Sequence, residues 1–143
     1  MRAALTCAAA LACACTPTLH RLAPYRSDPA AAEALERRAQ TVCMQARGVT
    51  PPHHFTTDGC SVWPDHGWVR CCVEHDMAYW CGGTSADRAH ADATLRDCVS
   101  AVHGSPMAWL MYAGVRVGGA PWEPFPWRWA YGWDFCRGDD GPR

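Results

Sequence analysis

The stretch from Cys71 to Cys81, CCVEHDMAYWC, contains the residues best suited to chemistry in this 143-residue chain. The imidazole of His75 can take up a proton near neutral pH, and the neighbouring carboxylate of Asp76 can bind a hard cation. Two adjacent cysteines before this pair and a third after it could anchor the segment through disulfides or bind a metal. A base beside a cation site would suit hydrolysis by an activated water.

The spacing of these residues defines two faces of a helix. Side chains four residues apart lie on the same face, so Cys72 points the same way as Asp76. By the same rule Cys71 points the same way as His75. The two faces are about 100° apart because a helical turn takes 3.6 residues. The adjacent cysteines would therefore tie one helix to two different neighbours.

A disulfide between Cys72 and Cys60 would create a cation site. The bond would bring Asp58, Gly59 and nearby backbone carbonyls against Asp76. Calcium takes six to eight hard oxygen ligands, and two carboxylates held this close would repel each other without a cation. If this pairing forms, the sequence predicts a calcium site in the loop.

A disulfide between Cys71 and Cys98 would complete a catalytic pair. In two antiparallel helices, His75 would then face a position one to two turns before Cys98, where Asp92 stands. A carboxylate behind a histidine fixes its tautomer and makes it a better general base. Together with calcium, which would stabilise an oxyanion, this pair predicts hydrolysis of an ester or similar acyl group.

Three segments resemble the secreted phospholipase A2 family. CCVEHDMAY matches the family's CCxxHDxxY active-site helix, and DGCS at 58–61 resembles the calcium-loop start of small bacterial and fungal members. ADATLRDC resembles the family's third-helix segment, and the resemblance covers about residues 55–100. It implies calcium-dependent hydrolysis of the sn-2 ester of glycerophospholipids by water, without a covalent intermediate, at a phospholipid membrane or micelle surface.

The resemblance also implies a role for each site residue. His75 would be the general base, Asp92 the carboxylate that orients it, and Tyr79 a hydrogen-bond partner near Asp92 from the next turn. Three residues would bind calcium, two through carboxylates and one through its backbone carbonyl: Asp58, Asp76 and Gly59.

The first 15 residues, MRAALTCAAALACAC, predict export. One Arg precedes a short run of small apolar residues, which is typical of a secretory signal and too short to span a bilayer. Cleavage after Ala12 or Ala14 would leave a cysteine first, so the segment resembles a bacterial lipoprotein signal. We therefore expect a periplasmic protein, a cell-envelope lipoprotein or a secreted protein.

Ten cysteines occur in the chain, and export makes disulfides their expected state. Zinc is the competing interpretation, because the CCxxH motif and the His53–His54 pair could supply ligands. No CxxC pair occurs, which favours disulfides. Beyond the two pairs considered above, Cys81 could bond to Cys136 and so pin the C-terminal tail, or it could bond to Cys43.

The remaining sequence predicts a small, mainly α domain stapled by disulfides, over residues 28–143 and after a linker at 16–27. A helix should begin at Asp28–Pro29 and end at Gly48, followed by a Gly/Pro-rich loop. Two antiparallel core helices should follow, from Val69 to Trp80 and from Ala86 to Val102.

The C-terminal third carries weaker sequence signals. Gly104 and Pro106 should end the second core helix, and the segment from Pro106 to Gly119 could form a helix or a strand. The tail beyond it is rich in Trp and Pro and has no regular period, so it predicts irregular structure that covers the core or meets a membrane.

Charge and composition exclude some functions. The chain has 13 Arg and Lys residues against 14 acidic ones, and this balance gives no case for nucleic-acid binding. It contains no Lys, which excludes a lysine nucleophile. The resemblance to the phospholipase A2 family implies a phospholipase-A2-like fold, and we expect a monomer.

Two alternatives remain open. Ser61 could be a nucleophile, although DGCSVWP lacks the tight GxSxG elbow on which such serines usually lie. The chain could also be a non-catalytic phospholipase-A2-like exported module that binds lipid or a protein partner. An enzyme needs the expected calcium ligands to converge, whereas a binding module needs only the disulfides.

Overall fold

The structure, a computed structural model, describes residues 22, 25–52 and 54–120. Within them lie four helices and no strand: α1 (Pro29–Arg47), α2 (Val69–Cys81), α3 (Ser85–His103) and α4 (Ser105–Gly118). The prediction of a mainly helical protein is therefore confirmed for this part of the chain. The expected signal at 1–15, most of the linker at 16–27 and the Trp/Pro-rich tail lie outside the described residues.

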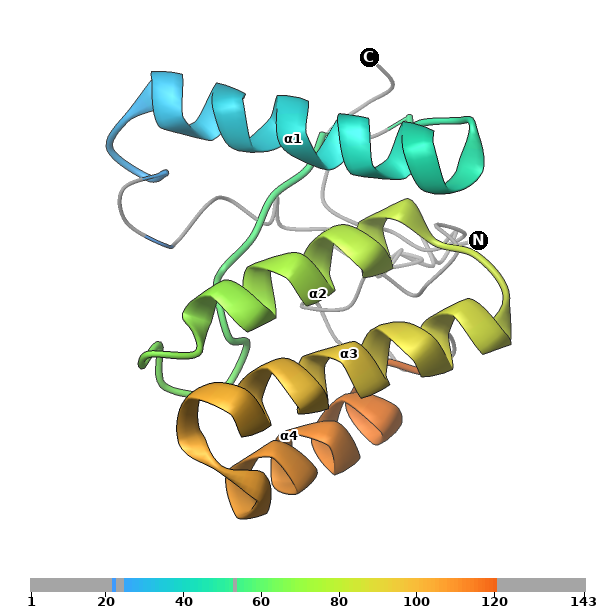
Figure 1. Cartoon of the computed structure of the whole chain (residues 1–143). Coiled ribbons are helices and arrows are strands. Elements are labelled where there is room, and N and C mark those ends of the chain that lie inside the picture. The colour runs from blue at the N-terminus through green and yellow to red at the C-terminus, as the bar shows by residue number, and fades with distance from the viewer. Residues whose placement is uncertain (1–21, 23–24, 53, 121–143) are drawn as a thin grey trace, which may run out of the picture.

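Each helix packs against the one that precedes it in the sequence (Figure 1). The α2 and α3 helices run antiparallel across the middle of the molecule, with α1 on one side of the pair and α4 on the other. None of the helices within residues 25–120 is both long and apolar enough to cross a membrane.

The ends of α1 follow the expected capping chemistry. The Asp28 side chain accepts hydrogen bonds from the backbone N–H groups of Ala30 and Ala31 at 3.0 and 3.1 Å. Gly48 ends the helix in the left-handed conformation, with φ of 72°, and its N–H donates to the carbonyl of Met44. A residue without Cβ adopts this conformation at little cost, so the helix ends where the sequence predicts.

The C-terminal segment is helical, and Pro106 lies in the first turn of this helix rather than only ending α3. The single residue Gly104 connects α3 to α4, and Pro106 stands in the first turn of α4. Proline fits there because the N–H that it lacks would have no partner within the helix. The segment that the sequence left undecided therefore packs as α4 against α3, the largest helix–helix contact in the described fold.

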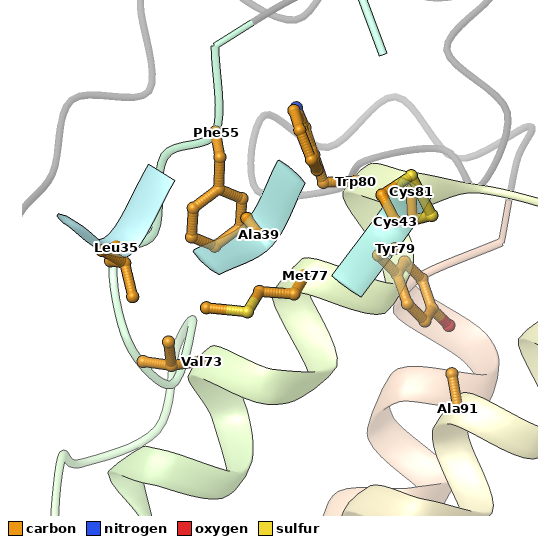
Figure 2. Packing of buried hydrophobic residues seen from close by; sticks show 10 residues of the cluster. All are labelled: Leu35, Ala39, Cys43, Phe55, Val73, Met77, Tyr79, Trp80, Cys81 and Ala91. Atoms are coloured by element: carbon orange, nitrogen blue, oxygen red, sulfur yellow. A yellow bond between two sulfur atoms is a disulfide. The ribbon is translucent and has the colours of Figure 1, made fainter. Parts of the chain in front are cut away.

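Two hydrophobic clusters hold the helices together. The first lies between α1 and α2, where Ala39, Phe55 and Met77 are almost wholly buried (Figure 2). In Figure 2, Tyr79 projects from another side of α2, toward Ala91 of α3. The second cluster packs α4 against α3 and the start of α2 through residues that are all buried: Cys60, Trp68, Cys71, Cys72, Leu95, Val99, Ala108 and Met111.

Among the described residues, three disulfides brace these contacts. Cys71–Cys98 joins α2 to α3, and Cys60–Cys72 joins the loop to α2, so both pairings considered from the sequence are confirmed. The third is Cys43–Cys81, which ties α1 to the end of α2 and answers the question of the Cys81 partner. Cys136 lies outside the described residues. Because disulfides persist in oxidising compartments, these bonds are consistent with export.

Removing the Cys43–Cys81 bond should lower stability more than its local contacts suggest. The bond closes a loop of 38 residues, and the chain-entropy model assigns such a loop about 4 kcal/mol. We expect the double variant Cys43→Ala/Cys81→Ala to lose about 2–4 kcal/mol in urea unfolding followed by far-UV circular dichroism. An unchanged unfolding midpoint would contradict a stabilising role for this bond.

Candidate functional site

The centre of the candidate site is a buried pair formed between α2 and α3. His75 Nε2 lies 2.8 Å from Asp92 Oδ1, and the Asp92 side chain has no exposed surface. The Cys71–Cys98 bond lies one turn from His75 and fixes the spacing of the two helices. The sequence therefore predicted this contact correctly.

Tyr79 supports the same carboxylate from one turn further along α2. Its hydroxyl donates to Asp92 Oδ1 at 2.7 Å, as the resemblance implied. Its ring also packs on that of His75, with centroids 4.3 Å apart. Two donors thus share one oxygen of Asp92.

Two arginines complete the network, and the sequence reasoning did not find them. Arg116 of α4 donates from Nη1 to Asp92 Oδ2, the oxygen that His75 leaves open. Arg88 of α3 donates from Nε to the Tyr79 hydroxyl at 3.0 Å and lies 4.0 Å from Asp92 Oδ2. The spacing of Arg88 and Asp92, four residues apart on a helix, was a usable signal. Arg116 stood in the segment whose structure the sequence left open.

These contacts keep Asp92 ionised inside the protein. Burial alone would raise its pKa, but hydrogen bonds from His75, Tyr79 and Arg116 outweigh that effect and hold the pKa below its usual value. Burial, and then the negative charge of Asp92, raise the pKa of the Tyr79 hydroxyl far above its normal range. The network therefore consists of a carboxylate held by a neutral phenol and a guanidinium.

An ionised Asp92 determines the proton positions on His75. A carboxylate only accepts hydrogen bonds, so Nε2 of His75 must carry the proton that the pair shares. In the neutral imidazole, Nδ1 is then an acceptor. This arrangement gives His75 the form that a general base requires.

An apolar cavity of about 240 Å³ opens beside His75. One wall comes from α4, where Met111 and Val115 alternate with glycines that leave room. The loop supplies another wall, including Val62 and Trp63. The cavity thus places His75, Asp76 and Tyr79 next to space lined mainly by carbon.

The loop before α2 carries the expected calcium ligands. Asp58 Oδ1 accepts a hydrogen bond from Ser61 at 2.7 Å, and Gly59 has a φ of 82°. Asp76 Oδ2 accepts a hydrogen bond from Thr57 at 2.6 Å, and the Thr57 hydroxyl in turn accepts from the N–H of Gly59. The Cys60–Cys72 bond holds this loop against α2.

Electrostatics at Asp76 suit a cation. Burial raises the pKa of its carboxyl well above the usual range, and the hydrogen bond from Thr57 only partly opposes this. The negative charges of Asp58 and Asp65 raise that pKa further. Calcium bound there would remove the repulsion, and carboxylate and carbonyl oxygens are the donors it prefers. No group of three or more His, Cys, Asp or Glu side chains in residues 25–52 and 54–120 is arranged to hold a metal, so backbone oxygens would be needed.

Asp65 is a loop residue that the sequence reasoning missed. Its Oδ1 accepts the N–H of Cys60 at 2.9 Å. A Cβ on Gly59 would come within 2.4 Å of the same oxygen, so this position has no room for a side chain. Position 59 thus requires glycine both for its backbone angle and for this close approach.

The geometry argues against two alternatives, a zinc site and a serine nucleophile. Cys71 and Cys72 are both in disulfides, so they cannot serve as zinc ligands. The Ser61 hydroxyl donates to Asp58, and no hydrogen bond joins it to His75 among the described residues. A serine nucleophile normally bonds to its base.

Comparison with known proteins does not assign the chain to a family. No protein-family model, curated protein or solved structure shows significant similarity to the chain. Conclusions about function therefore depend on the geometry of the site and on the motif resemblance.

The lowered pKa of Asp92 predicts acid-dependent stability. A carboxyl with a depressed pKa in the folded state stabilises the protein above its unfolded value of about 3.9, and this contribution is lost as the pH falls toward the folded value. We expect Asp92→Asn to lower the free energy of unfolding by about 2–4 kcal/mol at pH 7, because it leaves buried donors poorly paired. The deficit should shrink between pH 5 and pH 3, as measured by urea unfolding.

The matched control for this prediction is Asp97→Asn. Asp97 lies on the same helix, is exposed and pairs with Arg96 at the surface, so its loss should cost less than about 1 kcal/mol. A constant deficit of Asp92→Asn across this pH range would contradict the assignment of a buried carboxylate.

Proposed function

We propose that the protein is an exported, calcium-dependent phospholipase A2-like hydrolase that cleaves an ester bond, most directly the sn-2 ester, of glycerophospholipids. The observation that carries this proposal is the buried His75–Asp92 pair, which borders an apolar cavity next to the acidic loop. The motif resemblance also supports it, since the CCxxHDxxY helix contains His75 and the ADATLRDC segment contains Asp92.

The contacts of His75 support a direct proton-transfer mechanism. Its Nδ1 would take a proton from a water molecule as that water attacks the ester carbonyl carbon. Asp92 would hold the Nε2 proton and stabilise the positive charge that then forms on the ring. His75 would next give its proton to the departing alcohol oxygen, so the ester ends as a fatty acid and a lysophospholipid. No covalent bond to the protein is needed.

Calcium fits this scheme through the oxygen donors of the loop. Asp58 and Asp76 would hold it through their carboxylates, and Gly59 through its backbone carbonyl. When bound, it supplies positive charge that stabilises the developing negative charge on the ester carbonyl oxygen.

The apolar surface near the cavity supports a lipid surface as the partner. Val62, on the loop that lines the cavity, is 81% exposed, and Val117 of α4 is 70% exposed. Leu110 and Trp109 of the same helix are also more than half exposed. At 100° per residue, Leu110 and Val117 lie beside Gly114, which lines the cavity, so the apolar surface continues to its edge. A phospholipid surface would bury these side chains and could deliver an acyl chain to the cavity.

Fatty-acid release from mixed phospholipid micelles tests the enzymatic proposal. We expect release by the disulfide-intact protein with calcium, loss of release with a chelator, and a fall of about 10²–10⁴-fold in His75→Gln, which removes the base. Titration of released fatty acid measures all three. Activity that survives His75→Gln would overturn the assignment of His75. If a folded sample releases nothing from several lipids, the non-catalytic binding module becomes the better reading.

Vesicle binding tests the proposed surface. In a His75→Gln background, Val117→Asp should reduce pelleting with phosphatidylcholine vesicles about tenfold, because a charge would be placed among apolar groups that enter the interface. Val102→Asp is the matched control, since Val102 is also exposed, on α3, and lines no part of the cavity. Equal loss of binding in both variants would contradict a surface centred on α4.

A further inference from the structure

We propose that Arg116, at the end of α4, is a positioning residue for the His75–Asp92 pair, and that α4 is therefore part of the catalytic apparatus. This inference rests on the proposed function and extends it to a helix outside the region of motif resemblance. The argument begins with the two oxygens of Asp92.

Each oxygen of Asp92 has its own partners. His75 and Tyr79 bond to Oδ1, whereas Arg116 bonds to Oδ2. Contacts on a single oxygen restrain rotation about the Cβ–Cγ bond less firmly than contacts on both oxygens. Donors on both oxygens fix the plane of the group, and this plane determines the direction in which the His75 ring is held.

Arg116 also supplies a positive charge to Asp92. The Asp92 side chain is wholly buried, and Tyr79 gives it a hydrogen bond but no charge. A buried carboxylate without a counter-charge is strongly unfavourable. The guanidinium of Arg116 supplies that charge at bonding distance, and Arg88 adds a more distant one at 4.0 Å.

Arg88 fixes the backbone that carries Arg116. Its Nη2 donates to the carbonyls of Val115 and Arg116 at 3.1 and 2.7 Å, while its Nε donates to the Tyr79 hydroxyl. One buried side chain thus joins the last turn of α4 to the residue that supports Asp92. Gly119 lets the backbone after α4 lie close to Tyr79, because a Cβ at position 119 would lie 2.8 Å from the Tyr79 ring.

A positioning role and a purely structural role for Arg116 predict different responses to a small guanidinium ion in solution. The Arg116 side chain is 33% exposed, so its tip reaches the buried carboxylate from the surface. If the guanidinium alone matters, a small guanidinium ion from solution can occupy the space left by truncation. A residue that only packs the fold would not be replaced in this way.

The experiment is chemical rescue of Arg116→Ala. With a soluble, monomeric ester substrate and saturating calcium, we expect kcat to fall about 10–100-fold with KM within threefold of the original. Millimolar methylguanidinium should restore at least a tenth of the lost kcat. Arg116→Lys should be intermediate, since a single ammonium keeps the charge without the planar fork. Arg37→Ala is the matched control, because Arg37 is an exposed arginine of α1 paired with Glu33.

A second readout separates this inference from the proposed function. In ¹⁵N-histidine-labelled protein, the proton shared by His75 Nε2 and Asp92 should give a downfield NMR resonance that is lost or shifted in Arg116→Ala and returns with methylguanidinium. If the unaltered protein hydrolyses no ester, the proposed function fails, and the resonance alone decides the positioning role. An unchanged resonance in Arg116→Ala overturns the inference, as does an unchanged kcat in an active protein. Arg116→Lys provides the same comparison if Arg116→Ala does not fold.

Discussion

The buried negative charge of Asp92 is the constraint on which the arrangement of the site depends. A carboxylate removed from water needs partners on every side, and they come from three helices: His75 and Tyr79 from α2, Arg88 from α3 itself and Arg116 from α4. The helix pairs must pack at the spacing these contacts require, which the Cys71–Cys98 bond and the second hydrophobic cluster maintain. Removing a charge from the interior would thus loosen three helices at once.

The two sides of α2 have different surroundings, one mainly apolar and one polar. One side packs on α1 through the apolar side chains of Ala39, Phe55 and Met77, and the ion pair that joins Arg38 of α1 to Glu74 of α2 is partly exposed. The other side faces α3, the loop and the cavity, where polar groups lie close together and compete for hydrogen bonds. The repulsion between Asp76 and its neighbouring carboxylates therefore lies away from the apolar packing between α1 and α2.

Local signals predicted much of this structure. Capping residues located both ends of α1, and the i,i+4 rule placed His75 and Asp76 on the faces that the two disulfides then fixed. These local rules do not predict contacts between residues far apart in the sequence, because such contacts depend on how the whole chain folds. Arg116 meets Asp92 only because Gly104 turns α4 back along α3. From the sequence alone, Gly104 and Pro106 indicate only that a helix ends there. Asp65 likewise meets Gly59 through a loop whose shape no periodicity describes.

The adjacent cysteines of α2 have a consequence for how the bonds can form during oxidation. Exchanging the partners of Cys71 and Cys72 would change each closed loop by a single residue from its native separation of 27 or 12. On chain entropy the native and exchanged pairings then differ by only about 0.1 kcal/mol. Only the angle between neighbouring positions on a formed helix distinguishes them. A helical α2 therefore favours the native pairing, because it directs the two adjacent sulfurs toward different neighbours.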